Sequence, residues 1–243
     1  MKKILVASTN PGKVAELRAM LDFDVEWVGL SDFPNINEVK EDGETFAENA
    51  RKKAIGYAKA TGLWTIADDS GLVIDALCGE PGVRSARFAE AANKDNTFVT
   101  RASAPVARFD EGRETSDERR NVDRKNCEKV LKLLEDVPKK KRTARFVCCL
   151  CLASPPDEPA RRTAGKRRAS PKKVLIETEG KLEGVIAEKE MGTNGFGYDP
   201  IFFVPKLNKT VAQLTHEEKN AISHRGNAIR KLKPLLEELL ETT

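Results

Sequence analysis

The chain has 243 residues, 40% of them hydrophobic, which is enough for a sizeable core and excludes a fibrous or wholly disordered protein. Its net charge is +4, but residues 155–173 hold seven Lys and Arg residues and two Asp and Glu residues, so the rest of the chain carries −1. The bulk of the protein is therefore not a basic nucleic-acid binder, and nucleic acid is not an expected partner.

The apolar runs and the cysteines bear on the cellular compartment. No apolar run approaches the roughly 18 residues that a membrane helix needs, and the N-terminal run is too short for a signal peptide. Five cysteines without C-x-x-C spacing and only two histidines argue against disulfides and against a Cys or His metal site. We therefore expect a cytoplasmic protein without a membrane partner, in which any metal is a hard cation held by carboxylates.

The first part of the chain alternates short apolar runs with amphipathic stretches. Strands are expected at 3–8, 25–29, 63–67 and 72–77, and helices at 13–21 and 46–60. Thr45 and Glu48 form a capping box ahead of the second helix, and Gly62 ends it. This alternation of strands and helices predicts an α/β fold.

The second part of the chain is less regular. Residues 89–125 are charged with little apolar periodicity, so we expect a partly ordered excursion there. Further elements are expected as a helix at 127–137, a strand at 145–153, a hairpin over 174–187 around Glu179-Gly180, and a helix at 217–241 with a break or kink at Pro234. The basic, proline-containing segment 155–173 is expected to be a mobile loop that projects from the end of a hairpin formed by its flanking strands.

The junction between the first strand and the first helix carries residues suited to a phosphate group. They are Ser8, Thr9, Asn10, Pro11, Gly12 and Lys13. Asn10 suits the N-cap of a helix and Pro11 its first turn, while Lys13 adds positive charge to the helix N-terminus. The spacing is not that of a Walker A loop, so an ordinary capped helix start is the alternative interpretation.

A second candidate is the run Asp68-Asp69-Ser70-Gly71, which is expected to follow the end of an apolar strand. Adjacent carboxylates at such a place are costly unless a cation neutralises them, and a hard divalent metal that bridges to phosphate oxygens would do so. A carboxylate left free by that metal could deprotonate a water. The alternative is an acidic turn in which Asp69 or Ser70 binds the backbone.

Two further segments could bind a flat ligand. Residues 192–200 combine three glycines with Phe196 and Tyr198, so the backbone could fold closely around a ring that one of the aromatic residues stacks on. Lys219 and residues 223–226 supply consecutive cationic donors that could bind a carbonyl or phosphate. A structural glycine turn and solvated surface charge are the respective alternatives.

Taken together, the motifs closely resemble those of the inosine triphosphate pyrophosphatase family. The motifs that carry the resemblance are, in chain order, S-T-N-P-G-K, A-D-D-S-G-L, P-G-V-R-S-A-R, G-F-G-Y-D-P-I-F and E-E-K-N-A-I-S-H-R-G. The resemblance implies an α/β fold with a long central mixed β-sheet and flanking helices that form two lobes around a nucleotide cleft. It further implies a homodimer that uses Mg²⁺ to cleave non-standard purine nucleoside triphosphates (ITP, dITP, XTP) to the monophosphate and pyrophosphate, a house-cleaning activity.

The resemblance also implies a role for individual residues. The family's phosphate loop falls on Ser8, Thr9, Asn10, Pro11, Gly12 and Lys13, and its phosphate-binding lysine on Lys53. Its catalytic acid–base carboxylate, also a metal ligand, falls on Asp69, with Ser70 touching the substrate, Asp68 close by and Glu41 as the second metal ligand. The base pocket falls on Phe196, Gly197, Tyr198, Asp199, Lys219, His224 and Arg225.

The resemblance spans nearly all of a single domain, 1–243, with insertions expected near 90–125 and 155–173. Donors such as His224 and Arg225 would favour the 6-oxo group of inosine over the 6-amino group of adenosine. The alternatives are a pyrophosphatase of other base preference, similar to the Maf-like enzymes, and a nucleic-acid-binding protein that uses the basic segment 155–173. The G-F-G-Y-D and S-H-R-G motifs argue against the first, and the lack of aromatic residues in the basic segment argues against the second.

Overall fold

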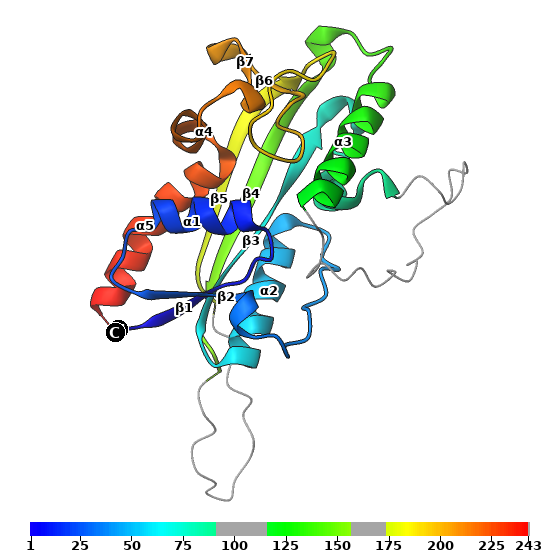
Figure 1. Cartoon of the computed structure of the whole chain (residues 1–243). Helices are drawn as coiled ribbons and strands as arrows, with labels where there is room; N and C mark the ends of the chain where they lie inside the picture. The colour runs from blue at the N-terminus through cyan, green and yellow to red at the C-terminus, as the bar shows by residue number, and fades with distance from the viewer. Residues whose placement is uncertain (91–115, 157–173, 243) are drawn as a thin grey trace, which may run out of the picture.

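The computed structural model of the chain describes residues 1–90, 116–156 and 174–242. Its strands are β1 (Lys3–Val6), β2 (Glu26–Gly29), β3 (Trp64–Ile74), β4 (Thr143–Ala153), β5 (Val174–Ile186), β6 (Phe202–Val204) and β7 (Lys209–Thr210). They form one sheet in the order β2-β1-β3-β4-β5-β6-β7 (Figure 1). β1 lies parallel to β2 and β3, and the pairs from β3 to β7 are antiparallel, so the sheet is mixed.

Helices flank this sheet. They are α1 (Pro11–Met20), α2 (Phe46–Thr61), α3 (Ser116–Leu133), α4 (His216–Ile222) and α5 (His224–Glu241). Leu150 of β4 packs with Leu17 of α1 and Leu232 of α5, whereas its neighbour Cys149 packs with Ala54 of α2. Since successive side chains of a strand point to opposite faces, α1 and α5 cover one face of the sheet and α2 covers the other. The predicted α/β fold with a mixed sheet and flanking helices is confirmed.

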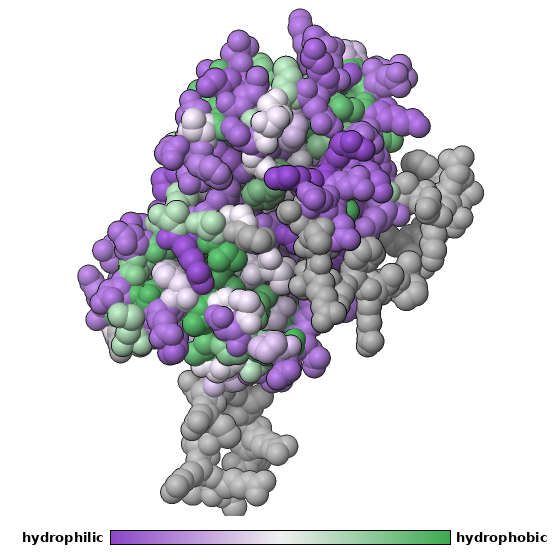
Figure 2. All heavy atoms as spheres, in the orientation of Figure 1, coloured by the Kyte–Doolittle hydropathy of each residue, from purple (hydrophilic) through white to green (hydrophobic). Residues whose placement is uncertain are grey.

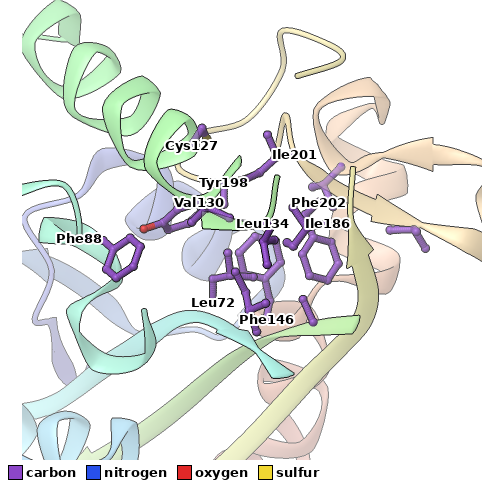
Figure 3. Close-up of a cluster of buried hydrophobic side chains, with 14 residues drawn as sticks. Leu72, Phe88, Cys127, Val130, Leu134, Phe146, Ile186, Tyr198, Ile201 and Phe202 are labelled. Atoms are coloured by element: carbon purple, nitrogen blue, oxygen red, sulfur yellow. The ribbon is translucent and has the colours of Figure 1, made fainter. Parts of the chain in front are cut away.

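A third hydrophobic cluster lies at the far end of β3 and β4. Figure 3 shows the Tyr198 ring among Val130 of α3 and Leu134, which follows that helix, near Leu72 of β3. Phe146 of β4 also belongs to this cluster and stacks on the ring of Phe202 at 4.3 Å between centroids. The long strands β3 and β4 therefore contribute side chains to the clusters on both faces of the sheet near β1 and, at their other end, to a separate cluster beneath α3.

The acidic run of β3 was expected to end a strand, and this prediction is wrong. β3 continues without interruption from Trp64 to Ile74, so Asp68 and Asp69 lie in the middle of a strand. Gly71 does not form a turn. It makes room for Ser85, because a Cβ at position 71 would collide with Ser85 Oγ. Ser85 Oγ also accepts a hydrogen bond from the backbone N–H of Leu72 at 2.9 Å. The carboxylates tolerate this interior place because cations reach them from other elements.

The hairpin expected around Glu179-Gly180 is also absent, because β5 is one strand that pairs with β4 along almost its whole length. Gly180 is required by a close approach: a Cβ there would collide with the carbonyl oxygen of His224 in α5. A glycine that admits a neighbouring helix has the same sequence signature as a glycine that permits a turn. This ambiguity explains the wrong prediction.

Two helix boundaries also differ from the predictions. α3 begins at Ser116, so residues 116–125 are helical although they lack an apolar stripe. Their Asp, Glu, Arg and Lys residues are compatible with a solvent-facing helix, and two acidic residues lie in the first turn. α5 continues through Pro234, and the break in this region lies instead at Ser223, whose side chain caps α5.

The flanks of the basic segment behave as expected, since β4 and β5 are antiparallel neighbours and Ala153 pairs with Val174. The segment itself, apart from its first two residues, lies outside the described residues, as does most of the stretch near 90–125. Figure 2 shows that one face of the molecule is mostly hydrophilic, with hydrophobic side chains gathered in its lower half around β1 and β2. Within the described ranges, none of the helices is long and apolar enough to cross a membrane.

Candidate active site

The predicted phosphate loop connects β1 to α1. Asn10 is the N-cap of α1, as predicted, and its Oδ1 accepts hydrogen bonds from the backbone N–H groups of Gly12 at 2.9 Å and Lys13 at 3.3 Å. Ser8 Oγ accepts from the Asn10 N–H at 3.2 Å. Asn10 thus occupies two amides of the helix start, and the positive charge that the loop offers comes mainly from the Lys13 side chain.

Asp68 lies on the α1 and α5 side of the sheet, surrounded by cations. Its Oδ2 is 3.1 Å from Lys13 Nζ and 3.2 Å from Arg225 Nη2, and it accepts a hydrogen bond from Ser70 Oγ at 3.3 Å. The side chain is 1% exposed. Burial raises the pKa of Asp68, but the charges of Lys13 and Arg225 outweigh it and hold that pKa far below its usual range. Asp68 is therefore a firmly ionised member of an ion network.

Asp69 points to the opposite face, toward α2, and has far fewer partners. Its Oδ1 is 3.6 Å from Lys53 Nζ, and its buried Oδ2 has no hydrogen-bond partner within the described residues. Burial raises the pKa of Asp69 to about 6, with a further contribution from the negative charge of Glu41, while Lys53 acts in the opposite direction. A buried carboxylate oxygen without a partner is a candidate reactive group.

Lys53 of α2 joins this carboxylate to the polar loop that precedes the helix. Its Nζ is 3.0 Å from Glu41 Oε2, so it stands between Glu41 and Asp69. Burial lowers the pKa of Lys53, but the charges of Asp69 and Glu41 outweigh that and raise it. The structure therefore brings together the three residues expected to hold a metal ion and a phosphate.

These residues fit a hard divalent cation. Glu41 and Asp69 offer carboxylate oxygens, the donor type that Mg²⁺ prefers, and Asp69 Oδ2 is unpartnered. The described parts of the chain contain no group of three or more His, Cys, Asp or Glu side chains that could hold a metal ion. A cation here would thus take two protein carboxylates and complete its shell with water or substrate oxygens, as Mg²⁺ commonly does.

The glycine-rich segment meets the phosphate loop through Phe196. A Cβ on Gly12 would lie 3.1 Å from the Phe196 ring, and Lys219 Nζ lies 4.3 Å from the centroid of that ring. Asp199 accepts hydrogen bonds from the Phe196 N–H at 3.0 Å and from Lys219 Nζ at 2.9 Å. Asp199 therefore fixes both the loop and the lysine beside the ring.

Tyr198, the other predicted stacking residue, lies in the core. Its ring belongs to the cluster beneath α3 (Figure 3), and its hydroxyl donates to the Ser85 carbonyl oxygen at 2.8 Å. The neighbouring Gly197 N–H donates to Asp123 Oδ2 of α3 at 2.7 Å. Of the two aromatic residues, Phe196 is the one that lies beside the phosphate loop.

Arg225 and His224 begin α5 and are both buried. Arg225 pairs with Glu16 of α1 and donates to Asp68 at 3.2 Å and Ser70 Oγ at 3.0 Å. The His224 ring stacks on Phe146 at 4.9 Å between centroids. Burial, followed by the charge of Arg225, lowers the pKa of His224 well below its usual value, so the imidazole is neutral near pH 7.

Sequence reasoning missed two residues of this site. Glu16 of α1 is buried, pairs with Arg225 and lies 3.3 Å from Lys219 Nζ. Asn49 of α2 is buried beside Asp69. Spacing offered one signal for each: Glu16 follows Lys13 by three residues, and Asn49 precedes Lys53 by four, so each shares a helix face with a predicted residue.

Known proteins that are similar to this chain cover nearly its whole length. A dITP/XTP pyrophosphatase of Listeria monocytogenes is 42% identical over 242 residues, which cover 99% of this chain and 98% of the relative. A dITP/XTP pyrophosphatase of Bacillus cereus is 43% identical over 239 residues, covering 98% of this chain and 96% of the relative.

Solved structures also match nearly the whole chain. The Staphylococcus aureus Ham1 protein matches with a TM-score of 0.71 and 38% identity, covering 98% of this chain and 99% of that protein. A HAM1 protein from Coxiella burnetii matches with a TM-score of 0.72 and 36% identity, covering 98% of this chain and 100% of that protein. Residues 4–116 and 103–235 match the Ham1 family, and we conclude that the chain belongs to it.

Proposed function

We propose that this chain hydrolyses non-standard purine nucleoside triphosphates, such as ITP, dITP and XTP, to the monophosphate and pyrophosphate. The observation that carries the proposal is the unpartnered Oδ2 of Asp69, buried beside Lys53 and Glu41. Relatives that are 42% and 43% identical bear the name dITP/XTP pyrophosphatase. We further propose a cytoplasmic homodimer, on the family resemblance, and light scattering on the purified protein would measure the oligomeric state.

The reaction centre is proposed at Asp69. Mg²⁺ held by Glu41 and Asp69 would neutralise triphosphate oxygens and polarise the α-phosphorus. Asp69 Oδ2 is placed to accept a proton from the attacking water, because no other described group occupies it. Asp68 is unsuited to that role, since it is ion-paired with Lys13 and Arg225.

Two lysines are proposed to hold the leaving pyrophosphate. Lys13 extends from the phosphate loop, and Lys53 extends from α2 on the opposite face of the sheet. Both now pair with carboxylates, and a bound triphosphate would offer them stronger anionic partners. Positioning and charge stabilisation of this kind account for most of enzymatic phosphoryl chemistry.

Base recognition is proposed at Phe196 and the residues around it. The ring lies against Gly12 and near Lys219, so a purine that stacks on Phe196 would have its triphosphate near the phosphate loop. Cationic and neutral donors at Lys219 and His224 would suit the 6-oxo acceptor of inosine or xanthosine. The 6-amino donor of adenine would leave such donors unpaired, at a cost of about 1–3 kcal/mol.

The decisive experiment measures phosphate release from a panel of eight nucleoside triphosphates with Mg²⁺, with and without added inorganic pyrophosphatase. We expect release from ITP, dITP and XTP only when pyrophosphatase is present, because the direct product is pyrophosphate. Removal of Mg²⁺ with EDTA should abolish it. Phosphate release without pyrophosphatase, or a preference for pyrimidine triphosphates, would contradict the proposal.

A further inference from the structure

Asn49 binds the loop that carries Glu41, one of the two residues proposed to hold the metal. We propose that Asn49 is a positioning residue that sets the distance between Glu41 and Asp69, by holding the loop that carries Glu41 against α2, the helix whose Lys53 lies beside Asp69. The inference rests on the proposed roles of Glu41 and Asp69. Asn49 lies in the second turn of α2 and is 2% exposed, so its amide is placed in a site where water does not compete for its hydrogen bonds.

The first contact of Asn49 is with the loop. Its Oδ1 accepts a hydrogen bond from the backbone N–H of Gly43 at 2.7 Å, two residues after Glu41. The approach is close, since a Cβ on Gly43 would lie 2.6 Å from that oxygen. A larger residue at position 43 would therefore push the loop away from α2.

The same helix also contacts Asp69 of β3. Lys53 lies one turn after Asn49 on the same helix, and its Nζ is 3.6 Å from Asp69 Oδ1 and 3.0 Å from Glu41 Oε2. The Asn49 oxygen therefore fixes the Glu41 loop to the helix that carries Lys53. An aspartate at position 49 could still accept from the Gly43 N–H, and an alanine could not.

A second tether of the same loop provides a matched control. Glu48 Oε2 accepts from the Glu44 N–H at 2.7 Å, and the Glu48 N–H donates to Thr45 Oγ1 at 3.2 Å. Glu48 is exposed, and none of its hydrogen bonds in the described structure goes to Asp69. Glu48→Ala thus loosens the loop without affecting the contact between α2 and the catalytic carboxylate.

The test compares Asn49→Ala, Asn49→Asp, Gly43→Ala and Glu48→Ala. Two quantities are measured: amide hydrogen exchange in a peptide covering residues 38–45, and the Mg²⁺ concentration that gives half the maximal rate of ITP hydrolysis. We expect Asn49→Ala and Gly43→Ala to speed the exchange and to raise the Mg²⁺ requirement about tenfold or more, the range for residues that orient metal ligands. Asn49→Asp should retain slow exchange, because it still accepts from Gly43, and Glu48→Ala should retain the wild-type Mg²⁺ requirement.

Unchanged exchange or an unchanged Mg²⁺ requirement in Asn49→Ala would overturn the proposal, as would a Glu48→Ala variant that needs as much Mg²⁺ as Asn49→Ala. If Asn49→Ala fails to fold, Gly43→Ala decides the question, because it displaces the loop and leaves the Asn49 side chain in place. Failure of the proposed function would be seen separately, as full activity of Asp69→Asn. The exchange measurement would still report whether Asn49 holds the loop.

Discussion

Asp68 and Asp69 are consecutive residues of β3, yet the two faces of the sheet treat them in opposite ways. On the α1 and α5 side, the carboxylates of Glu16, Asp68 and Asp199 are matched by Lys13, Lys219 and Arg225. On the α2 side, Glu41 and Asp69 share Lys53. The first cluster is balanced and the second carries an excess negative charge.

The difference in charge balance gives Asp68 a role in the fold and Asp69 a role in the proposed reaction. The cations around Asp68 hold its pKa far below the usual range against the effect of burial, whereas burial and Glu41 raise the pKa of Asp69 to about 6. Asp68 is thereby fixed as an anion that links α1, β3 and α5. Asp69 retains an unpartnered oxygen for a metal, a water or a proton.

The largest effect is expected from Asp69→Asn. The change preserves shape but removes both a metal-binding charge and the proposed proton acceptor, so kcat for ITP should fall by about 10²-fold or more. Tm should not fall, because the ion pair that the change removes, between Asp69 and Lys53, is long at 3.6 Å. Retention of more than about a tenth of the wild-type rate at saturating Mg²⁺ would refute the assignment of Asp69.

Asp68→Ala, unlike Asp69→Asn, should lower the free energy of unfolding. It leaves Arg225 and Lys13 without their shared carboxylate, and breaking a buried ion pair costs about 3–5 kcal/mol. Urea unfolding of the two variants side by side measures the contrast. Equal stability of Asp68→Ala and Asp69→Asn would mean that the balanced cluster does not support the fold.

In the glycine-rich segment 192–200, Phe196 and Tyr198 differ in the same way, one in substrate binding and the other in stability, and the expected effects are smaller. Phe196→Ala should raise KM for ITP by about fivefold or more, because base–aromatic stacking contributes about 1–3 kcal/mol, with little effect on Tm. Tyr198→Phe should leave KM unchanged and lower stability by about 1 kcal/mol, because the hydrogen bond to the Ser85 carbonyl is lost. If Tyr198→Phe raised KM while Phe196→Ala did not, the assignment of the two rings would be reversed.

The smallest effect is expected from replacing residues 157–173 with a short Gly/Asn turn. Ala153 and Val174 are paired at the ends of β4 and β5, so a short connection can join them. Loop shortening changes closure entropy only slightly, and we expect Tm within a few degrees and ITP turnover within about threefold. A loss of kcat/KM at low salt alone would indicate electrostatic steering by this basic segment, and a large loss of kcat at high salt would show that it contributes to the site.

Features that depend on neighbouring residues can be predicted from the sequence alone. The Asn10 cap, the N-cap at Thr45 and the end of α2 at Gly62 follow from local hydrogen bonding and backbone freedom, and the structure contains all three. Glu48, however, reaches Glu44 and not Thr45, so the predicted capping box is only half formed. The order of the motifs was enough to identify the family, because it is preserved along nearly the whole chain.

Features that depend on residues far apart in the chain become visible in the folded protein. Gly71 and Gly180 look like turn residues in the sequence, but each makes room for another segment, and the strands run through them. Asp68 and Asp69 cannot be told apart locally, because the partner that distinguishes them, Arg225, comes from α5 at the other end of the chain. Charge compensation and close packing act through space, and a local pattern records neither.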